Sequence, residues 1–99
     1  MPAIYHLTLV ADWETAKQSG FYEAESLKTE GFIHCCEEQQ VAGVLSRYFS
    51  GKKELLKLVI ETGKLQSRIV HEWSDSTRDT FPHIYGPINL DAVVEVIAL

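Results

Sequence analysis

The order of strand-like and helix-like segments is the feature that most constrains how this chain folds. Apolar and β-branched residues predict strands at residues 3–10, 32–36, 54–61, 68–73 and 92–99. Helices are predicted only in the first half, at residues 13–19, from near Ser26 to residue 30, and at residues 37–49. Helices early and strands late favour an α+β fold over a regular alternation of strand and helix.

Polar and conformationally special residues set the expected ends of these segments. Asp12 is predicted to cap the first helix, and Gly20 is predicted to end it. Residues 74–82 are expected to form a polar loop, followed by a short strand at Ile84–Tyr85 and a turn at Gly86–Pro87.

Length and charge limit the classes of function. The 99 residues suit a single domain, residues 1–99. The 9 basic and 14 acidic residues give a net charge of −5, and only Lys52 and Lys53 are adjacent cations. A large nucleic-acid footprint needs a basic face and is therefore not expected, whereas a small-molecule ligand remains compatible with this charge.

The N-terminal segment and the cysteines predict a cytoplasmic protein. No stretch approaches the ~20 apolar residues of a membrane helix, and the first residues lack the positive start of a secretory signal. We therefore expect no membrane contact, and we expect Cys35 and Cys36 to be thiols. The sequence leaves the oligomeric state open.

Two histidines lie within predicted strands. In the first strand, alternation places His6 with Ile4 and Thr8 on one face, and Tyr5, Leu7 and Leu9 on the other. The second face is expected to be core, so that His6 and Thr8 point into a partly polar space. His34 shares a strand face with Cys36. Both imidazoles suit ribose binding or proton transfer, and equally a buried structural hydrogen bond.

The adjacent cysteines are poorly spaced for a metal. Zinc sites usually separate two cysteines by two to four residues, whereas Cys35 and Cys36 face opposite sides of a strand. We therefore predict no metal site. Cys36 is a nucleophile only if a base such as His34 lowers its pKa.

Two further polar groups follow later in the chain. Only one of His71 and Glu72 can enter a given cleft, and Glu72 suits orienting a sugar hydroxyl or stabilising a developing cation, or else lies at a solvated rim. The run at residues 81–87 contains His83 and Tyr85 between two prolines and a glycine. It is expected to follow an unusual path and to stack on a flat ligand ring, or to pack Tyr85 on the core.

These motifs together resemble the Domain of Unknown Function 952 family. The resemblance rests on Ile4-Tyr5-His6, Trp13, Gly31-Phe32-Ile33-His34, Gln39, Glu72 and the run from Phe81 to Pro87. It covers nearly the whole chain. Cys36 stands where the family pattern suggests a serine.

The strand order and the two strand histidines also resemble the ADP-ribosyltransferase fold. This likeness implies a small, split, mainly antiparallel β-core with two to three helices from the N-terminal half and NAD bound in a cleft. His6 and His34 match histidines of the RNA 2′-phosphotransferases, although Leu7-Thr8 replaces their Gly-Thr. Glu72 falls near a transferase carboxylate, and Arg47 and Arg78 are candidates for the missing arginines.

Two hypotheses of function follow. In the first, the chain binds NAD or an ADP-ribosyl compound as substrate and catalyses ADP-ribosyl or related glycosyl transfer, with no certain cofactor. Glu72 and His34 are then the predicted catalytic residues; the predicted ligand-binding residues are His6, Thr8, His34, Cys36, His83 and Tyr85. In the second, the chain is a non-catalytic module for a small ligand or a protein, with His6 and His34 satisfied by the backbone. A thiol or metal enzyme built on Cys35 and Cys36 is a third, weaker alternative.

Overall fold

Three antiparallel strands form the largest sheet of the computed structural model, which describes residues 2–99. These strands are β1 (Ala3–Leu9), β4 (Leu55–Glu61) and β8 (Val93–Ala98), with β4 in the centre. In the register of β1 and β4, Ile4 lies opposite Ile60 and His6 lies opposite Leu58. The alternating apolar residues of β4 therefore share a sheet face with His6.

A second three-stranded antiparallel sheet contains β3 (Ile33–His34), β6 (Asp79–Tyr85) and β5 (Arg68–Ser74), in that order. A third sheet pairs β2 (Phe21–Tyr22) with β7 (Ile88–Asn89). The main chains of Tyr5 and Cys36 exchange hydrogen bonds of 2.9 and 2.8 Å. This bridge joins the end of β3 to β1, so that the first two sheets meet beside His6.

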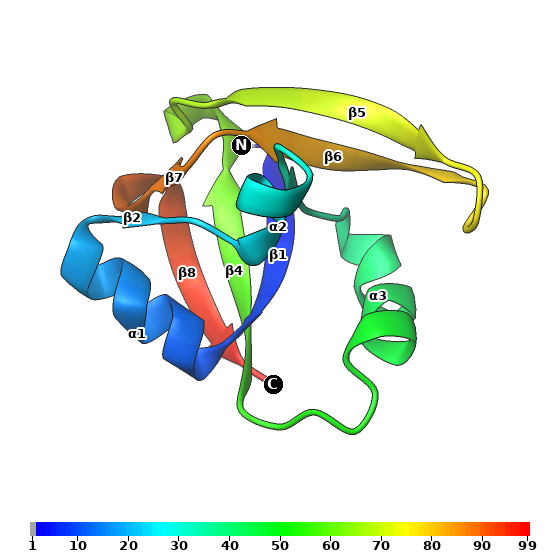
Figure 1. Ribbon diagram of the computed structural model, residues 1–99, viewed down its shortest axis with the longest axis horizontal. Coiled ribbons are helices and arrows are strands. Elements are labelled where there is room, and N and C mark those ends of the chain that lie inside the picture. Colours follow the sequence, from blue (N-terminus) through cyan, green and yellow to red (C-terminus); the bar gives the residue numbers. More distant parts are fainter. Residues whose placement is uncertain (1) are drawn as a thin grey trace.

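The α-helices all come from the first half of the described chain (Figure 1). They are α1 (Val10–Ser19), α2 (Glu25–Thr29) and α3 (Val41–Tyr48). Single 3₁₀ turns lie at Glu38–Gln40, Thr62–Lys64 and Leu90–Ala92. In Figure 1, α1 and α3 lie on either side of β1 and β4. The predicted α+β class, with mostly antiparallel sheets and few helices, is confirmed. No helix among residues 2–99 is long and apolar enough to cross a membrane.

The fully buried side chains come from strands of all three sheets. They include Ile33, Leu58, Ile60, Ile84 and Ile88. The prediction that the Tyr5 face of the first strand is the core face was wrong, because Ile4 belongs to the main core and Tyr5 is only half-buried. The Ile4 face of β1 is buried because it lies beside the apolar residues Leu58 and Ile60 of β4, and His6 is buried on the same face.

The predicted polar loop at residues 74–82 was also wrong. Strand β6 begins at Asp79 and runs through Pro82 to Tyr85, leaving only a short turn after β5. The Pro82 carbonyl accepts from the amide of Cys35, 3.0 Å away, which is the residue after the end of β3. Proline is tolerated in this central strand because the side of Pro82 that lacks an N–H faces this end of β3.

Helix boundaries differ from the expectation at two places. The first helix begins at Val10, so Asp12 lies in its first turn, and Leu9 caps it without a side-chain bond. Gly20 ends it as predicted, with a left-handed φ of 96° that favours glycine. The predicted helix at 37–49 is divided into a 3₁₀ turn and α3, and the Gln40 side chain caps the start of the turn by accepting from the Glu37 amide at 2.8 Å.

Candidate functional site

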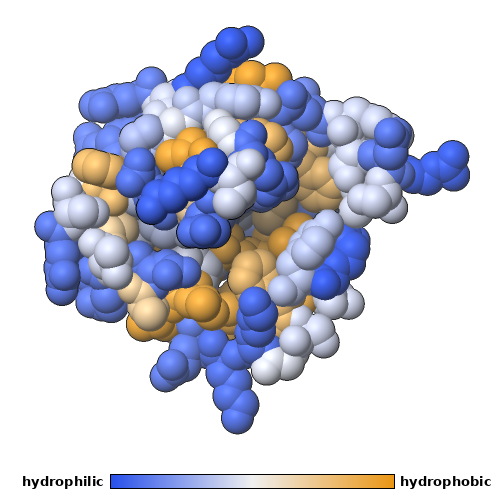
Figure 2. Space-filling model, viewed as in Figure 1, coloured by the Kyte–Doolittle hydropathy of each residue, from blue (hydrophilic) through white to orange (hydrophobic). Residues whose placement is uncertain are grey.

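A cavity of about 770 Å³ lies where the two larger sheets meet. Strand β1 and helix α2 form one wall, and α3, the segment after it and the β5–β6 hairpin form the other. Figure 2 shows the surface hollowed between α2 and α3, with apolar residues in its depth. The volume falls within the roughly 300–1,000 Å³ typical of small-molecule sites.

The two walls differ in chemistry. The α3 and hairpin wall is largely apolar and aromatic, and includes Val44, Tyr48, Phe49, Trp73 and Phe81. The opposite wall carries the imidazoles, hydroxyls and carboxylates, including His6, Thr8, Tyr22, Glu25, Glu30 and His34. A ligand with a flat apolar ring and a polar remainder matches this division.

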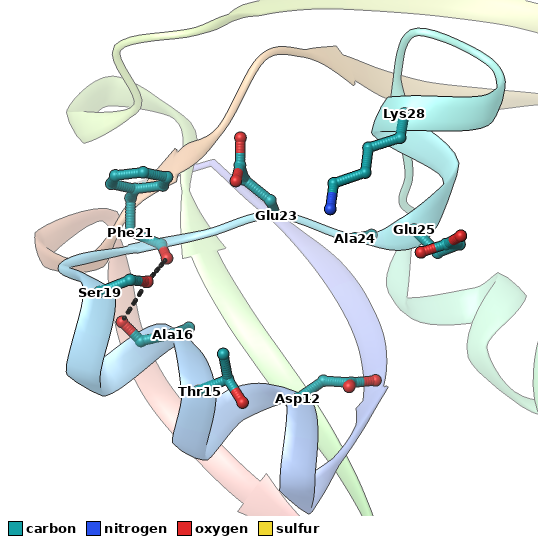
Figure 3. A pocket seen from close by; sticks show the side chains of 9 residues that line it. All are labelled: Asp12, Thr15, Ala16, Ser19, Phe21, Glu23, Ala24, Glu25 and Lys28. Carbon is teal, nitrogen blue, oxygen red and sulfur yellow. Dashed lines mark hydrogen bonds between the residues drawn. The ribbon is translucent and has the colours of Figure 1, made fainter.

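A smaller cavity of about 170 Å³ adjoins the first one beside α1 (Figure 3). Asp12 and Glu25 line both cavities and therefore mark their boundary. In Figure 3, the Lys28 amine lies away from the Glu25 carboxylate. Lys28 therefore does not pair with Glu25, and the two carboxylates that the cavities share, Asp12 and Glu25, give their boundary a negative charge.

The polar floor of the larger cavity is built around His6. The imidazole Nδ1 lies 2.6 Å from the main-chain carbonyl oxygen of His34, and Nε2 lies 2.8 Å from the Tyr22 hydroxyl. Because a carbonyl only accepts, Nδ1 carries the proton. The Tyr22 hydroxyl also lies 2.9 Å from the Thr8 hydroxyl, which completes a chain of three buried polar side chains.

Burial sets the protonation states of this chain. It lowers the pKa of His6 to about 4 and raises the pKa of Tyr22 to about 12. At neutral pH both groups are uncharged, so Nε2 of His6 must accept the hydroxyl proton of Tyr22. Thr8 then donates to Tyr22. This arrangement reverses when His6 is protonated, since Nε2 becomes a donor.

His34 occupies the rim rather than the floor. Its ring is about half exposed, and Nε2 lies 3.0 Å from a Glu30 carboxylate oxygen at the end of α2. The His34 ring meets the Phe32 and His83 rings edge to face, with centroids 4.9 and 5.1 Å away. Phe32 stacks flat on His83 at 4.1 Å, so the three rings form one aromatic cluster.

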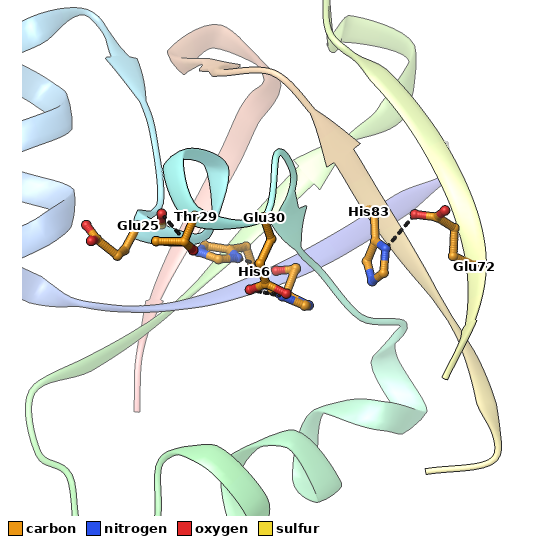
Figure 4. Close-up of polar contacts among 7 residues, drawn as sticks. His6, Glu25, Thr29, Glu30, Glu72 and His83 are labelled. Atoms are coloured by element: carbon orange, nitrogen blue, oxygen red, sulfur yellow. Dashed lines mark hydrogen bonds and ion pairs between the residues drawn. The ribbon is translucent and has the colours of Figure 1, made fainter. Parts of the chain in front are cut away.

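His83 is held from the opposite side by Glu72 (Figure 4). Its Nδ1 lies 2.7 Å from the Glu72 Oε1, and the Tyr85 hydroxyl donates to the same oxygen at 2.6 Å. These two bonds, Tyr85 first, lower the pKa of Glu72, while Glu72 raises the pKa of Tyr85. With Nδ1 engaged, Nε2 is the His83 nitrogen that a ligand in the cavity can contact.

The predicted site residues therefore divide into two groups. His6, Thr8, His34, Cys36 and His83 all line the cavity. Glu72 and Tyr85 are not among the residues that line it: Glu72 bonds to His83, and Tyr85 bonds to Glu72. His71 lies 3.5 Å from Glu37, which leaves Glu72 as the member of that pair on the His83 side.

Both cysteines are buried thiols. Burial raises the pKa of Cys36 to about 11 and raises that of Cys35 further above its ordinary value. The His6 imidazole bonds to His34 and Tyr22, not to either sulfur. Within residues 2–99, no three His, Cys, Asp or Glu side chains are grouped to hold a metal ion. The thiol chemistry considered from the sequence therefore gains no support.

Three important residues were missed at the level of sequence. Tyr22 lies in a two-residue strand, Phe32 precedes β3 and Glu30 follows α2. Phe32 shares a strand face with His34, and this alternation was the one signal that could have included it in the site. Tyr22 and Glu30 meet their histidines only through tertiary packing.

Comparison with solved structures identifies similar proteins of the same fold. A crystal structure of protein CC0527 from Caulobacter crescentus aligns with a TM-score of 0.89 and 28% identity, over 99% of this chain and 86% of that chain. Its solution NMR structure aligns with a TM-score of 0.83 and 29% identity, over 100% and 85% of the two chains. No curated protein matches.

A family model covers nearly all of the chain. The model described as Protein of unknown function (DUF952) matches residues 7–96. This span includes every residue that bonds within the His6 and His83 groups except His6 itself, namely Thr8, Tyr22, His34, Glu72, His83 and Tyr85. The resemblance found in the sequence motifs is confirmed, and the chain belongs to the DUF952 family.

Proposed function

We propose that the cavity binds a ribosylated aromatic base, with NAD or an ADP-ribosyl compound as the candidate substrate, and that the chain catalyses glycosyl transfer of the ADP-ribosyl type. The observation that carries this proposal is the Glu72–His83 pair at the cavity wall, with its 2.7 Å bond. The finer fold assignment, an ADP-ribosyltransferase-like split β-core, is part of the same proposal. Support for it comes from two antiparallel sheets that meet at the Tyr5–Cys36 bridge.

Ligand binding is supported by the shape and lining of the cavity. Phe49, Trp73 and Phe81 supply aromatic surface for a flat base. The Thr8 hydroxyl and Nδ1 of His34 supply hydrogen-bonding groups for a ribose on the opposite wall. Each wall of the cavity thus matches one part of a nucleoside.

The proposed chemistry places His83 as general acid or base. As the C1′–N bond breaks, its electron pair leaves with the base, and a lone pair of the acceptor oxygen forms the new bond to C1′. The acceptor proton passes to Nε2 of His83. Glu72 holds Nδ1–H and stabilises the imidazolium that forms.

This assignment redistributes the predicted catalytic roles. Glu72 acts as a positioning residue because it reaches the reaction through His83 and is absent from the cavity lining. His34, at the rim, holds ligand through Nδ1 while Glu30 fixes its Nε2. The alternative, a non-catalytic binding module, is favoured by one observation: both nitrogens of His6 are already satisfied within the protein.

A ¹⁵N-resolved NMR titration with NAD, ADP-ribose and nicotinamide riboside at millimolar concentration tests binding. We expect amide shifts around His34, Trp73 and His83. If none of these compounds shifts any cavity residue, the proposed ligand class is wrong.

Turnover assays then separate enzyme from binding module. We expect His83→Gln to lower kcat by about 10²–10⁴-fold, the usual range for general acid–base help. Glu72→Gln should lower kcat with KM unchanged and should also move the pH profile, which a loss of stability alone does not do. His71→Gln, an exposed neighbour paired with Glu37, is the matched control. If the protein binds these compounds but turns over none of them, the proposed catalysis is wrong and the chain is a non-catalytic binding module.

A further inference from the structure

The charge of the large cavity is strongly unbalanced. Its lining includes the carboxylates of Asp12, Glu25 and Glu30. Among the described residues that line it, Lys52 is the one side chain with a permanent positive charge. Three negative charges against one positive charge leave the cavity at −2 when its histidines are neutral, within a chain whose net charge is −5.

The carboxylates are distributed along one wall. Glu30 bonds to His34 at the rim, and Asp12 and Glu25 mark the boundary with the smaller cavity. Lys52 lies on the opposite side, in the segment after α3, where its ammonium is 5.8 Å from the centre of the Phe49 ring. The single cation is therefore next to the aromatic wall and not among the carboxylates.

This distribution is unfavourable for a diphosphate. Proteins hold phosphate groups with arginine or lysine side chains, or with the amides of a helix N-terminus. The cavity contains no arginine among its described lining residues. A doubly negative diphosphate placed inside would be repelled by the three carboxylates and attracted by Lys52 alone, whereas a positive ring would be attracted to the carboxylates and to aromatic faces.

We propose that the cavity takes the nucleoside end of its ligand and selects a positively charged base, so that a phosphate-free ribosyl pyridinium binds more tightly than a diphosphate-bearing ribosyl compound. This inference rests on the proposed function, since it names the substrate class of the same site. The carboxylates line the wall that the proposed function assigns to the ribose, so they would also stabilise the positive charge that the ribosyl group gains as its C1′–N bond breaks.

The test measures dissociation constants for three probes: nicotinamide riboside, its uncharged reduced form, and ADP-ribose. At low salt, the dissociation constant of nicotinamide riboside should be at least about tenfold lower than that of ADP-ribose. It should also bind more tightly than its reduced form, which has a nearly identical shape and no charge. Both preferences should shrink at high salt, because screening weakens the carboxylate contribution.

A matched pair of variants locates the effect. Asp12→Asn combined with Glu25→Gln should weaken nicotinamide riboside binding by about threefold for each carboxylate, the factor for unit charges roughly 6 Å apart in water. The same double variant should strengthen ADP-ribose binding. The control is Glu14→Gln, an exposed α1 carboxylate that pairs with Lys17 and does not line the cavity.

The outcomes distinguish this inference from the proposed function. If ADP-ribose binds as tightly as nicotinamide riboside, or if the double variant leaves both constants unchanged, the charge inference is overturned and the proposed function stands. If no ribosyl compound binds, the proposed function fails together with the inference.

Discussion

The Nδ1 of His6 and the carbonyl oxygen of His34 lie 2.6 Å apart, so the two strand histidines are joined through a side chain and a main chain rather than through their rings. His6 thereby satisfies the backbone of β3 near the end of its pairing with β6. His34 is left with its own ring at the rim, about half exposed. One histidine is thus mainly structural, and the other is available to a ligand.

Replacing His6 should destabilise the fold. The substitution His6→Ala removes a buried ring and leaves the His34 carbonyl and the Tyr22 hydroxyl without their partner. We expect a loss of about 2–4 kcal/mol in the free energy of unfolding, from the cavity and the unpaired groups together. Guanidinium denaturation followed by circular dichroism measures it. The control His34→Ala keeps the main-chain carbonyl and should cost much less; equal losses would contradict the structural role of the His6 ring.

The stability of the protein should depend on pH through His6. Burial lowers its pKa from 6.5 to about 4, so between these values the unfolded chain binds the proton more readily than the folded one. The contribution of His6 to the free energy of unfolding should therefore be fully present above pH 6.5 and fall as the pH drops toward 4, by about 3 kcal/mol in total.

Denaturation curves at a series of pH values test this dependence. Other groups also titrate in acid, so the relevant quantity is the difference between the parent protein and His6→Gln. That difference should shrink as the pH falls from 6.5 to 4. The same comparison with His71→Gln, at an exposed position, should show no such change. A parent protein whose stability is constant over this range would rule out a neutral buried His6.

The sequence predicts the strands that are rich in apolar and β-branched residues better than those that are very short or contain a proline. Strands β1 and β4 were located within one residue, because a period of two is a strong signal. The first part of β6 was taken for a loop, since Pro82 normally interrupts a central strand, whereas its last two residues, Ile84–Tyr85, were predicted as a short strand. The two-residue strands β2 and β7 carry no periodicity at all.

The candidate site was predicted by residue type but not by contact. Alternation correctly grouped His6 with Thr8, and both line the cavity. It could not reveal that Tyr22 lies 2.8 Å from His6, because these residues come from different sheets. Glu72 was predicted to be a functional carboxylate, whereas its 2.7 Å bond to His83 depends on the register of β5 and β6, which the sequence does not reveal.

Removing the Tyr85 hydroxyl should change the acidity of Glu72. The hydroxyl donates to Oε1 at 2.6 Å and is the largest cause of the lowered pKa of this carboxyl group. We expect Tyr85→Phe to raise the pKa of Glu72 toward its ordinary value, measured by ¹³C NMR titration of the side-chain carboxyl. Tyr48→Phe, at an exposed tyrosine of α3, is the control. An unchanged Glu72 titration in Tyr85→Phe would mean that the hydrogen bond does not persist in solution.

Both cysteines should be inert in the folded protein. Cys35 and Cys36 are 5% and 2% exposed, and burial raises the pKa of both thiols, that of Cys36 to about 11. Because the thiolate is the reactive form, neither should react appreciably with a chromogenic disulfide reagent at pH 8. In guanidinium, both thiols of the denatured protein should react with the reagent, and the denatured Cys36→Ser variant should show one reactive thiol.

Native labelling that is fast at one thiol would reverse this assignment. The variant Cys36→Ser identifies which sulfur reacts, since loss of the signal in that variant assigns it to Cys36. A fast reaction at Cys36 would require a thiolate in the cavity wall and would support the hypothesis that Cys36 is a nucleophile. Labelling that proceeds only as fast as the chain unfolds, and that speeds up in the destabilised His6→Ala protein, is the result expected from two buried thiols.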